Sequence, residues 1–256
     1  MLNEQTIQKL YNLRLGAMAL AWQDQQKDTK ATRLGFDERF GMLVDSEHLA
    51  RHNRRLTRLL KDAQLRLPNA CIEDVETSGK RGLESALWRQ LASGQWLSDH
   101  LNVLITGATG VGKSYLCCAL GQLACRRGLR TAYRRLPRLL EELTLAKAEG
   151  TYHRLLAKLA KTDLLLIDDL GMGSGLKEAH RQDLLEVLDD RYGRRCTAVT
   201  SQMKVQHWHE WIGDPTIADA ILDRLVHNAH RIDLKGPSRR DPKSSASRRT
   251  EDESSN

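Results

Sequence analysis

The sequence predicts an α/β protein, in which helices cover both faces of a parallel β-sheet, preceded by a small all-helical N-terminal domain. Three observations support this fold class. Beyond residue 100, short apolar segments alternate with helical segments, as in parallel α/β proteins. The first apolar segment runs directly into a glycine-rich loop and a helix. The first 66 residues instead carry helical periodicity throughout.

The composition is that of a soluble globular protein. Hydrophobic residues make up 40% of the 256 residues, charged residues make up 29%, and the formal net charge is +7. No apolar run approaches the roughly 18 residues of a membrane span, and the first residues contain no apolar signal-peptide core. The five cysteines form no CxxC pair, which favours reduced thiols over a disulfide framework or a zinc site. We therefore expect a cytoplasmic protein without a membrane partner, whose basic excess is compatible with nucleic acid.

Residues 1–66 are expected to form a helical domain that binds DNA or a partner protein. Apolar residues recur there at the spacing of an amphipathic helix: Ile7, Leu10, Leu13, Ala17 and Leu20. A second helix is expected from about Phe36 to Leu65, because no proline or glycine interrupts residues 42–67.

Glycine, proline and mixed charges mark residues 67–82 as a linker. The expected second domain is 83–240, and the polar residues 241–256 are expected to be a mobile tail. The strands of this domain are predicted at about 101–106, 130–133, 163–168, 196–200 and 231–234. The helices are predicted at about 83–91, 113–127, from Pro137 onward, and at about 152–160, 176–192 and 215–228.

The clearest functional motif is GATGVGKS, which fits G-x-x-x-x-G-K-[ST] and lies between a predicted strand and a predicted helix. Its glycines allow backbone N–H groups to surround phosphate oxygens, and the helix N-terminus adds partial positive charge. Lys113 can reach the β- and γ-phosphates, and the Ser114 hydroxyl can ligate Mg²⁺. A loop that merely turns the chain would need neither side chain. The expected nucleotide-binding residues are Gly107, Ala108, Thr109, Gly110, Val111, Gly112, Lys113, Ser114 and Tyr115.

Two carboxylates, Asp168 and Asp169, follow an apolar strand at the sheet edge where ligands bind in open α/β folds. Asp168 is expected to hold Mg²⁺ together with Ser114. Asp169 is expected to orient or deprotonate the attacking water. Alone, this pattern is also typical of an ordinary strand end, and the phosphate loop favours the functional interpretation. The next predicted strand ends in Thr200, Ser201 and Gln202, which are either ordinary polar residues or contacts of the γ-phosphate or the attacking water.

Arg224 lies on the predicted helix at 215–228, beside a buried stripe formed by Ile217, Ile221 and Leu225. Its spacing fits a surface arginine, and it also fits an arginine donated to the nucleotide of a neighbouring subunit.

Five cations share one face of the predicted helix that begins near Phe36: Arg51, Arg54, Arg55, Arg58 and Lys61. Such a row matches the phosphate backbone of DNA, although a solvated charged face has the same pattern. A second cluster, Arg126 to Arg138, surrounds the second predicted strand and favours a polyanionic partner.

Taken together, these segments resemble the IstB-like ATP-binding proteins. These are transposition helpers encoded beside the transposase of bacterial insertion sequences, in the same AAA+ branch as the DnaC helicase loaders. The resemblance rests on GATGVGKS, LLLIDDLG and TAVTSQ, and above all on WIGDPTIADAILDRLVHNAHRIDLKG. It extends over the helical N-terminal region.

The resemblance implies an AAA+ P-loop ATPase that uses ATP and Mg²⁺. Lys113, Asp168 and Asp169 would be catalytic, with Gln202 as the sensor 1 residue. Arg224 would be an arginine finger acting on the adjacent subunit, and Arg240 a sensor 2 arginine. Asp169 stands where AAA+ ATPases at large carry Glu, so slow, assembly-dependent turnover is expected.

The resemblance also implies a homo-oligomer that assembles on double-stranded DNA, presents the target to a cognate transposase, and is dismantled by ATP hydrolysis. One alternative is a helicase loader like DnaC, whose N-terminal helices bind a replicative helicase. Another is a nucleotide-binding module without turnover. The cationic helix face favours duplex binding over a helicase contact.

Overall fold

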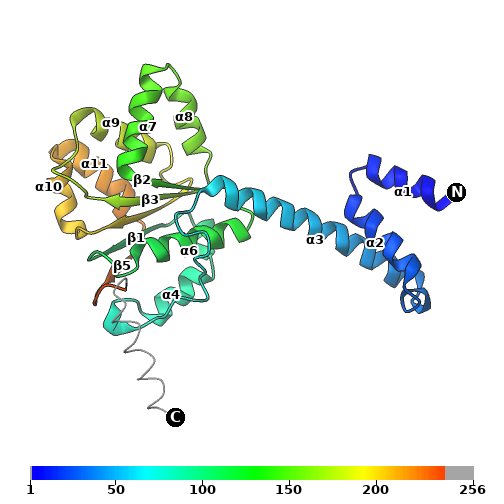
Figure 1. Cartoon of the computed structure of the whole chain (residues 1–256). Coiled ribbons are helices and arrows are strands. Elements are labelled where there is room, and N and C mark those ends of the chain that lie inside the picture. The colour runs from blue at the N-terminus through cyan, green and yellow to red at the C-terminus, as the bar shows by residue number, and fades with distance from the viewer. Residues whose placement is uncertain (1, 240–256) are drawn as a thin grey trace, which may run out of the picture. The chain divides into compact units, whose positions relative to one another are not determined.

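The computed structural model describes residues 2–239 (Figure 1). Arg240 and the predicted tail 241–256 lie outside these residues. The chain divides into two compact units, Met1–Arg58 and Leu59–Asn256. The division falls inside helix α3 (Phe36–Ala63), so the two units share one continuous helix. None of the helices described is long and apolar enough to cross a membrane.

The N-terminal unit contains two short helices, α1 (Leu2–Asn12) and α2 (Gly16–Lys27), where the apolar spacing predicts one. Arg14 has a φ of 60°, in the left-handed region, and this ends the first helix. The side chain of Glu47, from α3, then satisfies the start of α2. Its carboxylate accepts hydrogen bonds from the backbone N–H groups of Ala17 and Met18, at 2.9 and 3.2 Å. A buried carboxylate far along the chain therefore sets this helix boundary.

The residues that follow α3, which include the predicted linker 67–82, are packed against the rest of the second unit. Leu65, Ala70, Ile72 and Leu83 are all buried. The indole of Trp88 donates to the carbonyl oxygen of Ile72 at 3.2 Å. A short 3-10 turn, η2 (Gly79–Arg81), precedes the next helix. The predicted linker is therefore packed on the second unit, beside the phosphate loop.

The second unit is built on a five-stranded parallel sheet with the strand order β2-β3-β4-β1-β5. Its strands are β1 (Asn102–Gly107), β2 (Thr131–Arg135), β3 (Leu164–Leu170), β4 (Cys196–Ser201) and β5 (Ala229–Leu234). The predicted alternation of strands and helices is confirmed. Because all strands are parallel, their carboxyl ends lie along the same side of the sheet. Residues that follow the strands therefore gather at this carboxyl-terminal edge.

Helices cover both faces of this sheet (Figure 1). On one face lie α4 (Ser85–Ala92) and α6 (Lys113–Arg126), with the short α5 (Gln95–Ser98) after α4. The other face carries α7 (Leu136–Ala148), α8 (Tyr152–Ala160), α9 (Glu178–Asp189), α10 (Trp208–Ile212) and α11 (Pro215–Val226). The α/β class predicted from the sequence is therefore confirmed, together with the helical N-terminal region.

The core explains why α6 lies so close to the sheet. Its apolar residues include the buried thiols of Cys117 and Cys118, which act as small fillers. Gly121 faces the sheet, and a Cβ atom there would lie 2.6 Å from a methyl group of Leu166 and 2.9 Å from one of Leu65. Any larger residue would push the helix away from β3.

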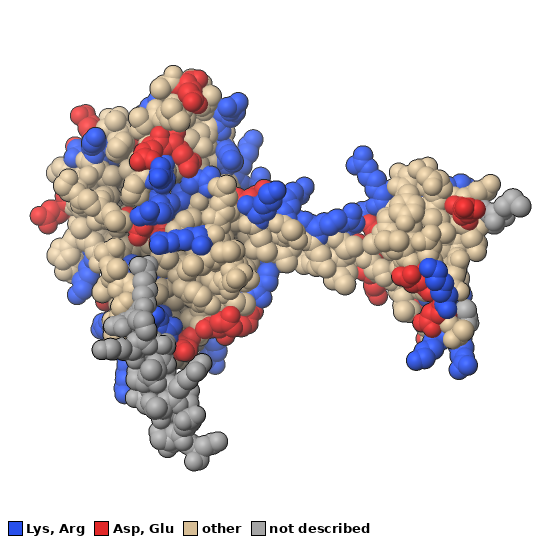
Figure 2. Space-filling view, in the orientation of Figure 1, with Lys and Arg blue, Asp and Glu red and all other residues tan. Residues whose placement is uncertain are grey.

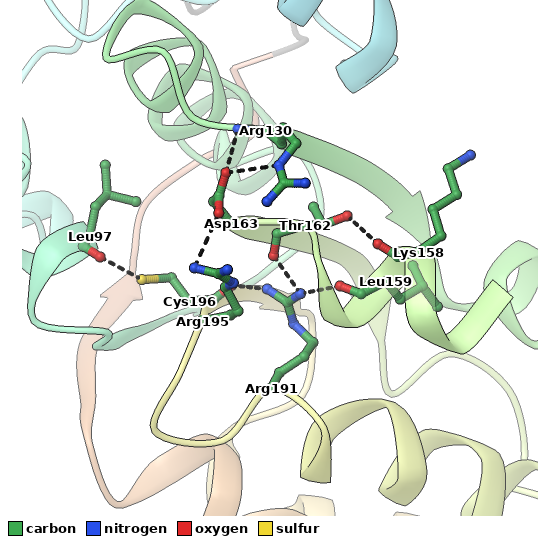
Figure 3. A network of polar contacts seen from close by, with 9 residues as sticks. All are labelled: Leu97, Arg130, Lys158, Leu159, Thr162, Asp163, Arg191, Arg195 and Cys196. Atoms are coloured by element: carbon green, nitrogen blue, oxygen red, sulfur yellow. Dashed lines mark hydrogen bonds and ion pairs between the residues drawn. The ribbon is translucent and has the colours of Figure 1, made fainter. Parts of the chain in front are cut away.

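A buried arginine joins the starts of two central strands to α8 (Figure 3). Arg191 is 1% exposed and has no carboxylate partner in the described part of the chain. Its guanidinium donates to the carbonyl oxygens of Leu159, Thr162 and Cys196, and its Nε donates to the Thr197 hydroxyl at 3.1 Å. Burial lowers the pKa of Arg191 to about 10, so the side chain keeps its charge at neutral pH. Four backbone and hydroxyl dipoles together take the place of a counter-ion.

Candidate nucleotide-binding site

The predicted phosphate loop connects the end of β1 to the start of α6. Gly110 and Gly112 have φ values of 85° and 104°, which favour glycine. A Cβ atom at Gly112 would lie 2.7 Å from the guanidinium of Arg81. The two glycines therefore let the loop backbone come close to neighbouring groups. A loop whose N–H groups surround a phosphate needs the same close approach.

Lys113 begins α6 and is 7% exposed. Its ammonium group donates to the carbonyl oxygen of Ala108 at 2.8 Å, on the far side of the loop. The lysine therefore spans the interior of the loop, where the β- and γ-phosphates of a bound nucleotide would lie.

Ser114 and Asp168, the predicted metal ligands, are hydrogen-bonded to each other. The Ser114 hydroxyl lies 3.1 and 3.0 Å from the two carboxylate oxygens of Asp168. Asp168 is fully buried on β3 and also accepts hydrogen bonds from the hydroxyls of Tyr133, at 2.5 Å, and Thr200. A hydroxyl and a carboxylate are oxygen ligands of the kind Mg²⁺ prefers, and Mg²⁺ usually keeps water and phosphate in its remaining positions. The residues present therefore fit this ion.

Asp169 lies at an irregularity in the sheet. The pairing of β3 with β4 shifts between Ile167 and Leu170, and Asp169 has a φ of 65°. This backbone turns its side chain away from the core and towards the pocket. There the carboxylate accepts from Nε of Arg135 at 2.8 Å, while its backbone N–H donates to the Thr200 hydroxyl at 3.2 Å.

The polar residues that end β4 have separate roles. Ser201 is buried, and its hydroxyl donates to the carbonyl oxygen of Leu170 at 2.6 Å. Gln202 lies in the pocket, where its side-chain oxygen accepts from the Thr109 hydroxyl of the phosphate loop at 2.8 Å. Gln202 therefore contacts the phosphate loop, whereas Ser201 links the ends of β4 and β3.

A pocket of about 380 Å³ opens between the phosphate loop and the segment that follows α3. Sequence reasoning missed three cations in its wall: Arg66, Arg81 and Arg239. Arg239 donates its backbone N–H to the carbonyl oxygen of Gly110 at 2.9 Å, and Arg81 donates to that of Val111 at 2.9 Å. The predicted Arg240 lies outside the described residues. The lining residues are Arg66, Leu67, Asp74, Arg81, Thr109, Gly110, Gly112, Lys113, Ser114, Tyr115, Asp169, Gln202 and Arg239.

Tyr133 and Arg135 were also missed as site residues. Both lie on β2, and Arg135 pairs in register with Asp168 on β3. Burial and the hydrogen bond to Asp168 raise the pKa of Tyr133 far above its ordinary value, so its hydroxyl remains a donor. Strand spacing could have indicated these residues, but only once the pairing of β2 with β3 was known.

Arg224 lies at the opposite edge of the sheet. Its backbone carbonyl oxygen accepts from the side chain of Asn102, the first residue of β1, at 2.8 Å. Its guanidinium pairs with Asp189 at 2.6 Å and lies 5.9 Å from the ring centre of Tyr192. Arg224 is therefore not part of the pocket in its own chain.

The five cations predicted on one helical face are all exposed on α3. Arg51 and Arg54 pair with Glu47, at 2.8 and 3.3 Å. The second predicted cluster is largely neutralised. Its ion pairs join Arg126 to Glu73, Arg130 to Asp163, Arg134 to Glu142 and Arg138 to Glu141. These pairs lower the positive charge of both surfaces.

The fold and the site define the class of protein. A phosphate loop after β1, an acidic pair on β3 and a sheet of this strand order are those of an AAA+ P-loop nucleotide-binding domain. The chain resembles the DnaC helicase loader in fold, with a TM-score of 0.54 and 16% identity, over 65% of this chain and 97% of that one. It also resembles domain III of the Thermotoga maritima replication initiation protein DnaA, with a TM-score of 0.58 and 21% identity, over 74% of this chain and 76% of that one.

Sequence comparison identifies the family. Residues 8–247 match the IstB-like ATP binding proteins, and the chain belongs to this family. It is 48% identical to the insertion sequence ATP-binding protein y4pL of Sinorhizobium fredii, over 94% of this chain and 97% of that protein. It is 46% identical to an ATP-binding protein of insertion sequence IS1162 from Pseudomonas fluorescens, over 79% of this chain and 87% of that protein.

Proposed function

We propose that this protein is an ATP-hydrolysing helper of a transposase, which assembles on double-stranded DNA in its ATP-bound state. The contact of Ser114 with Asp168 beside the phosphate loop carries the ATP part of this proposal. In an ATP complex, Lys113 would contact the β- and γ-phosphates, and Ser114 and Asp168 would hold Mg²⁺. The ion would neutralise phosphate charge as the terminal bond breaks.

Asp169 and Gln202 would act on the γ-phosphate side of the pocket. Asp169 would orient the attacking water and accept its proton, and ADP would leave from the γ-phosphorus. In the structure Asp169 pairs with Arg135, so this pair would have to loosen before Asp169 could act on water. Slow turnover that depends on assembly fits such a restrained base.

The position of Arg224 supports the proposal that the protein forms a homo-oligomer. It lies at the edge of the sheet opposite the phosphate loop, so it cannot reach the nucleotide of its own chain. A neighbouring subunit that places its pocket against this edge would receive a guanidinium at the γ-phosphate. We propose that Arg224 acts in this way and leaves Asp189 when subunits assemble.

A basic groove in the second unit supports DNA as the partner. The groove has a volume of about 840 Å³ and lies between the last turn of α3, β2 and α8. It is lined by six cations, of which Arg130 and Arg134 are ion-paired: Lys61, Arg130, Arg134, Arg154, Lys158 and Lys161. Figure 2 shows Lys and Arg side chains gathered on the side of this unit that carries α8. Arg55 and Arg58 on α3 remain further candidates for phosphate contacts.

A cognate transposase and a cytoplasmic location complete the proposal. Relatives that share nearly half of the sequence are named for insertion sequences, which move by transposition. The thiols of all five cysteines are free, as expected in a reducing compartment. Hydrolysis would dismantle the assembly once the transposase has taken the target. A helicase loader is the alternative, because about two thirds of the chain resembles DnaC in fold.

DNA binding in the presence of a nonhydrolysable ATP analogue tests this proposal. We expect duplex DNA to bind more tightly than single-stranded DNA, and the combined change Lys158→Gln and Lys161→Gln to weaken duplex binding. The slope of log affinity against log salt should fall by about 0.9 for each lost phosphate contact. The control is Lys177→Gln with Lys80→Gln, which removes the same charge elsewhere on the surface. A preference for single strands would favour the helicase loader.

A further inference from the structure

Arg66 extends from the segment after α3 to the buried carboxylate of the site. Gln64 has a φ of 52° and ends the helix, and Leu65 is buried against α6. This anchors the backbone next to Arg66. Its Nη1 lies 3.5 Å from Oδ2 of Asp168.

Asp168 depends on this contact for its charge balance. Its carboxylate is 1% exposed, and three hydroxyl groups donate to it. Hydroxyls supply dipoles, whereas a buried carboxylate is stabilised most by a positive charge. Within residues 2–239, Arg66 is the cation that the structure pairs with Asp168.

A divalent ion at Ser114 and Asp168 would change this balance. Two positive groups would then compete for one carboxylate, so the guanidinium would be repelled from it. The Arg66 side chain is 42% exposed and lines the same pocket as Lys113 and Gln202. It can therefore swing into the pocket without unpacking the core.

The place that Arg66 would take is next to the terminal phosphate. It approaches from the side of Asp168 and Asp169, whereas the loop backbone surrounds the inner phosphates and Lys113 spans from the β- to the γ-phosphate. A planar guanidinium is well suited to two oxygens of one phosphate group.

We propose that Arg66 is a nucleotide-state sensor. Without nucleotide it rests on Asp168, and with Mg²⁺ and ATP it leaves Asp168 and binds the γ-phosphate. ADP lacks this group, so Arg66 distinguishes the two nucleotides. Arg66 lies three residues after Ala63, where α3 ends. A movement of Arg66 between Asp168 and the γ-phosphate therefore takes place next to the end of that helix. The inference rests on the proposed binding of ATP and Mg²⁺.

The test compares Arg66→Ala with wild type and with Arg138→Ala, in which an exposed arginine of α7 is lost. Each full-length protein is titrated with ADP and with a nonhydrolysable ATP analogue, both with Mg²⁺. We expect Arg66→Ala to weaken binding of the analogue about tenfold, the loss of one charge-assisted phosphate contact, and to change ADP binding less than twofold. Arg66→Lys should recover part of the lost affinity.

Three other results would overturn the sensor role. They are an equal loss for both nucleotides, an unchanged affinity for both, or a loss for ADP alone. Circular dichroism shows whether Arg66→Ala is folded. If it is not, the ratio of the affinities of Arg66→Lys for the ATP analogue and for ADP is compared with the wild-type ratio instead. Wild type that binds neither nucleotide would refute the proposed function itself, which separates the two failures.

A second measurement addresses the resting contact with Asp168. In the ADP complex, Arg66→Ala removes the cation that competes with Mg²⁺. The concentration of Mg²⁺ that gives half-maximal effect on ADP binding should therefore fall by about threefold, whereas Arg138→Ala should leave it unchanged. A higher Mg²⁺ requirement in Arg66→Ala would mean that Arg66 does not compete for this carboxylate.

Discussion

The hydroxyl of Ser114 contacts both carboxylate oxygens of Asp168, at 3.1 and 3.0 Å, although one residue lies on helix α6 and the other on strand β3. One side chain belongs to the first turn of the helix after the phosphate loop, and the other lies near the end of a central strand. The groups expected to bind phosphate and those expected to bind the metal are therefore adjacent in the fold.

Lys113→Ala should abolish useful ATP binding. The ammonium group lies inside the loop and would make charge-assisted contacts with two phosphates, so its loss should weaken affinity about a hundredfold or more. Titration with a fluorescent ATP analogue measures the change, and Lys177→Ala serves as the surface control. Wild-type affinity in Lys113→Ala would remove this lysine from the site.

Asp168→Asn should separate binding from turnover. The phosphate loop is unchanged, so ATP affinity should fall less than about threefold, but the loss of a metal ligand should slow Mg²⁺-dependent hydrolysis by about a hundredfold. Phosphate release at increasing Mg²⁺ concentrations is the measurement. Turnover that higher Mg²⁺ fully restores would show a weakened metal site, and turnover unchanged at every concentration would contradict the role of Asp168.

Arg224→Ala should bind ATP normally and lose hydrolysis in the assembly, by about 10³–10⁵-fold for an arginine finger. Mixing Arg224→Ala subunits with Asp169→Asn subunits should restore part of the activity. In such a mixture some junctions combine an intact Arg224 with an intact Asp169. If both variants assemble and no mixture recovers activity, Arg224 does not act on the neighbouring subunit.

Arg191→Ala should destabilise the second unit severely. The change leaves a cavity and four buried acceptors without their donor, which together cost about 3–5 kcal/mol of the free energy of unfolding. Urea unfolding followed by circular dichroism measures the loss. The matched control is Arg194→Ala, an exposed neighbour, which should change stability by less than about 0.5 kcal/mol. Equal effects of the two changes would show that the buried network contributes little.

Local sequence predicts the elements that carry the phosphate loop and Asp168. The run from Leu164 to Ile167 is apolar and β-branched at its end, and it forms a fully buried central strand. Asp214 and Pro215 indicate the start of α11, where the Asp214 side chain accepts from the backbone N–H of Ile217. These features depend on neighbours within a few residues, so the sequence displays them directly.

The phosphate loop and the acidic pair could be predicted from the sequence because each consists of consecutive residues, and the parallel α/β fold could be predicted from the alternation of apolar and helical segments. The distant side chains that complete the site are brought there by tertiary contacts. Tyr133 and Arg66 reach Asp168 because β2 pairs with β3 and the segment after α3 packs on α6. Tertiary structure also decided which cations are neutralised, as Glu73 shows for Arg126 and Asp163 for Arg130. A charge pattern along the chain specifies no partner, since Coulomb and hydrogen-bond energies depend on distances that only folding sets.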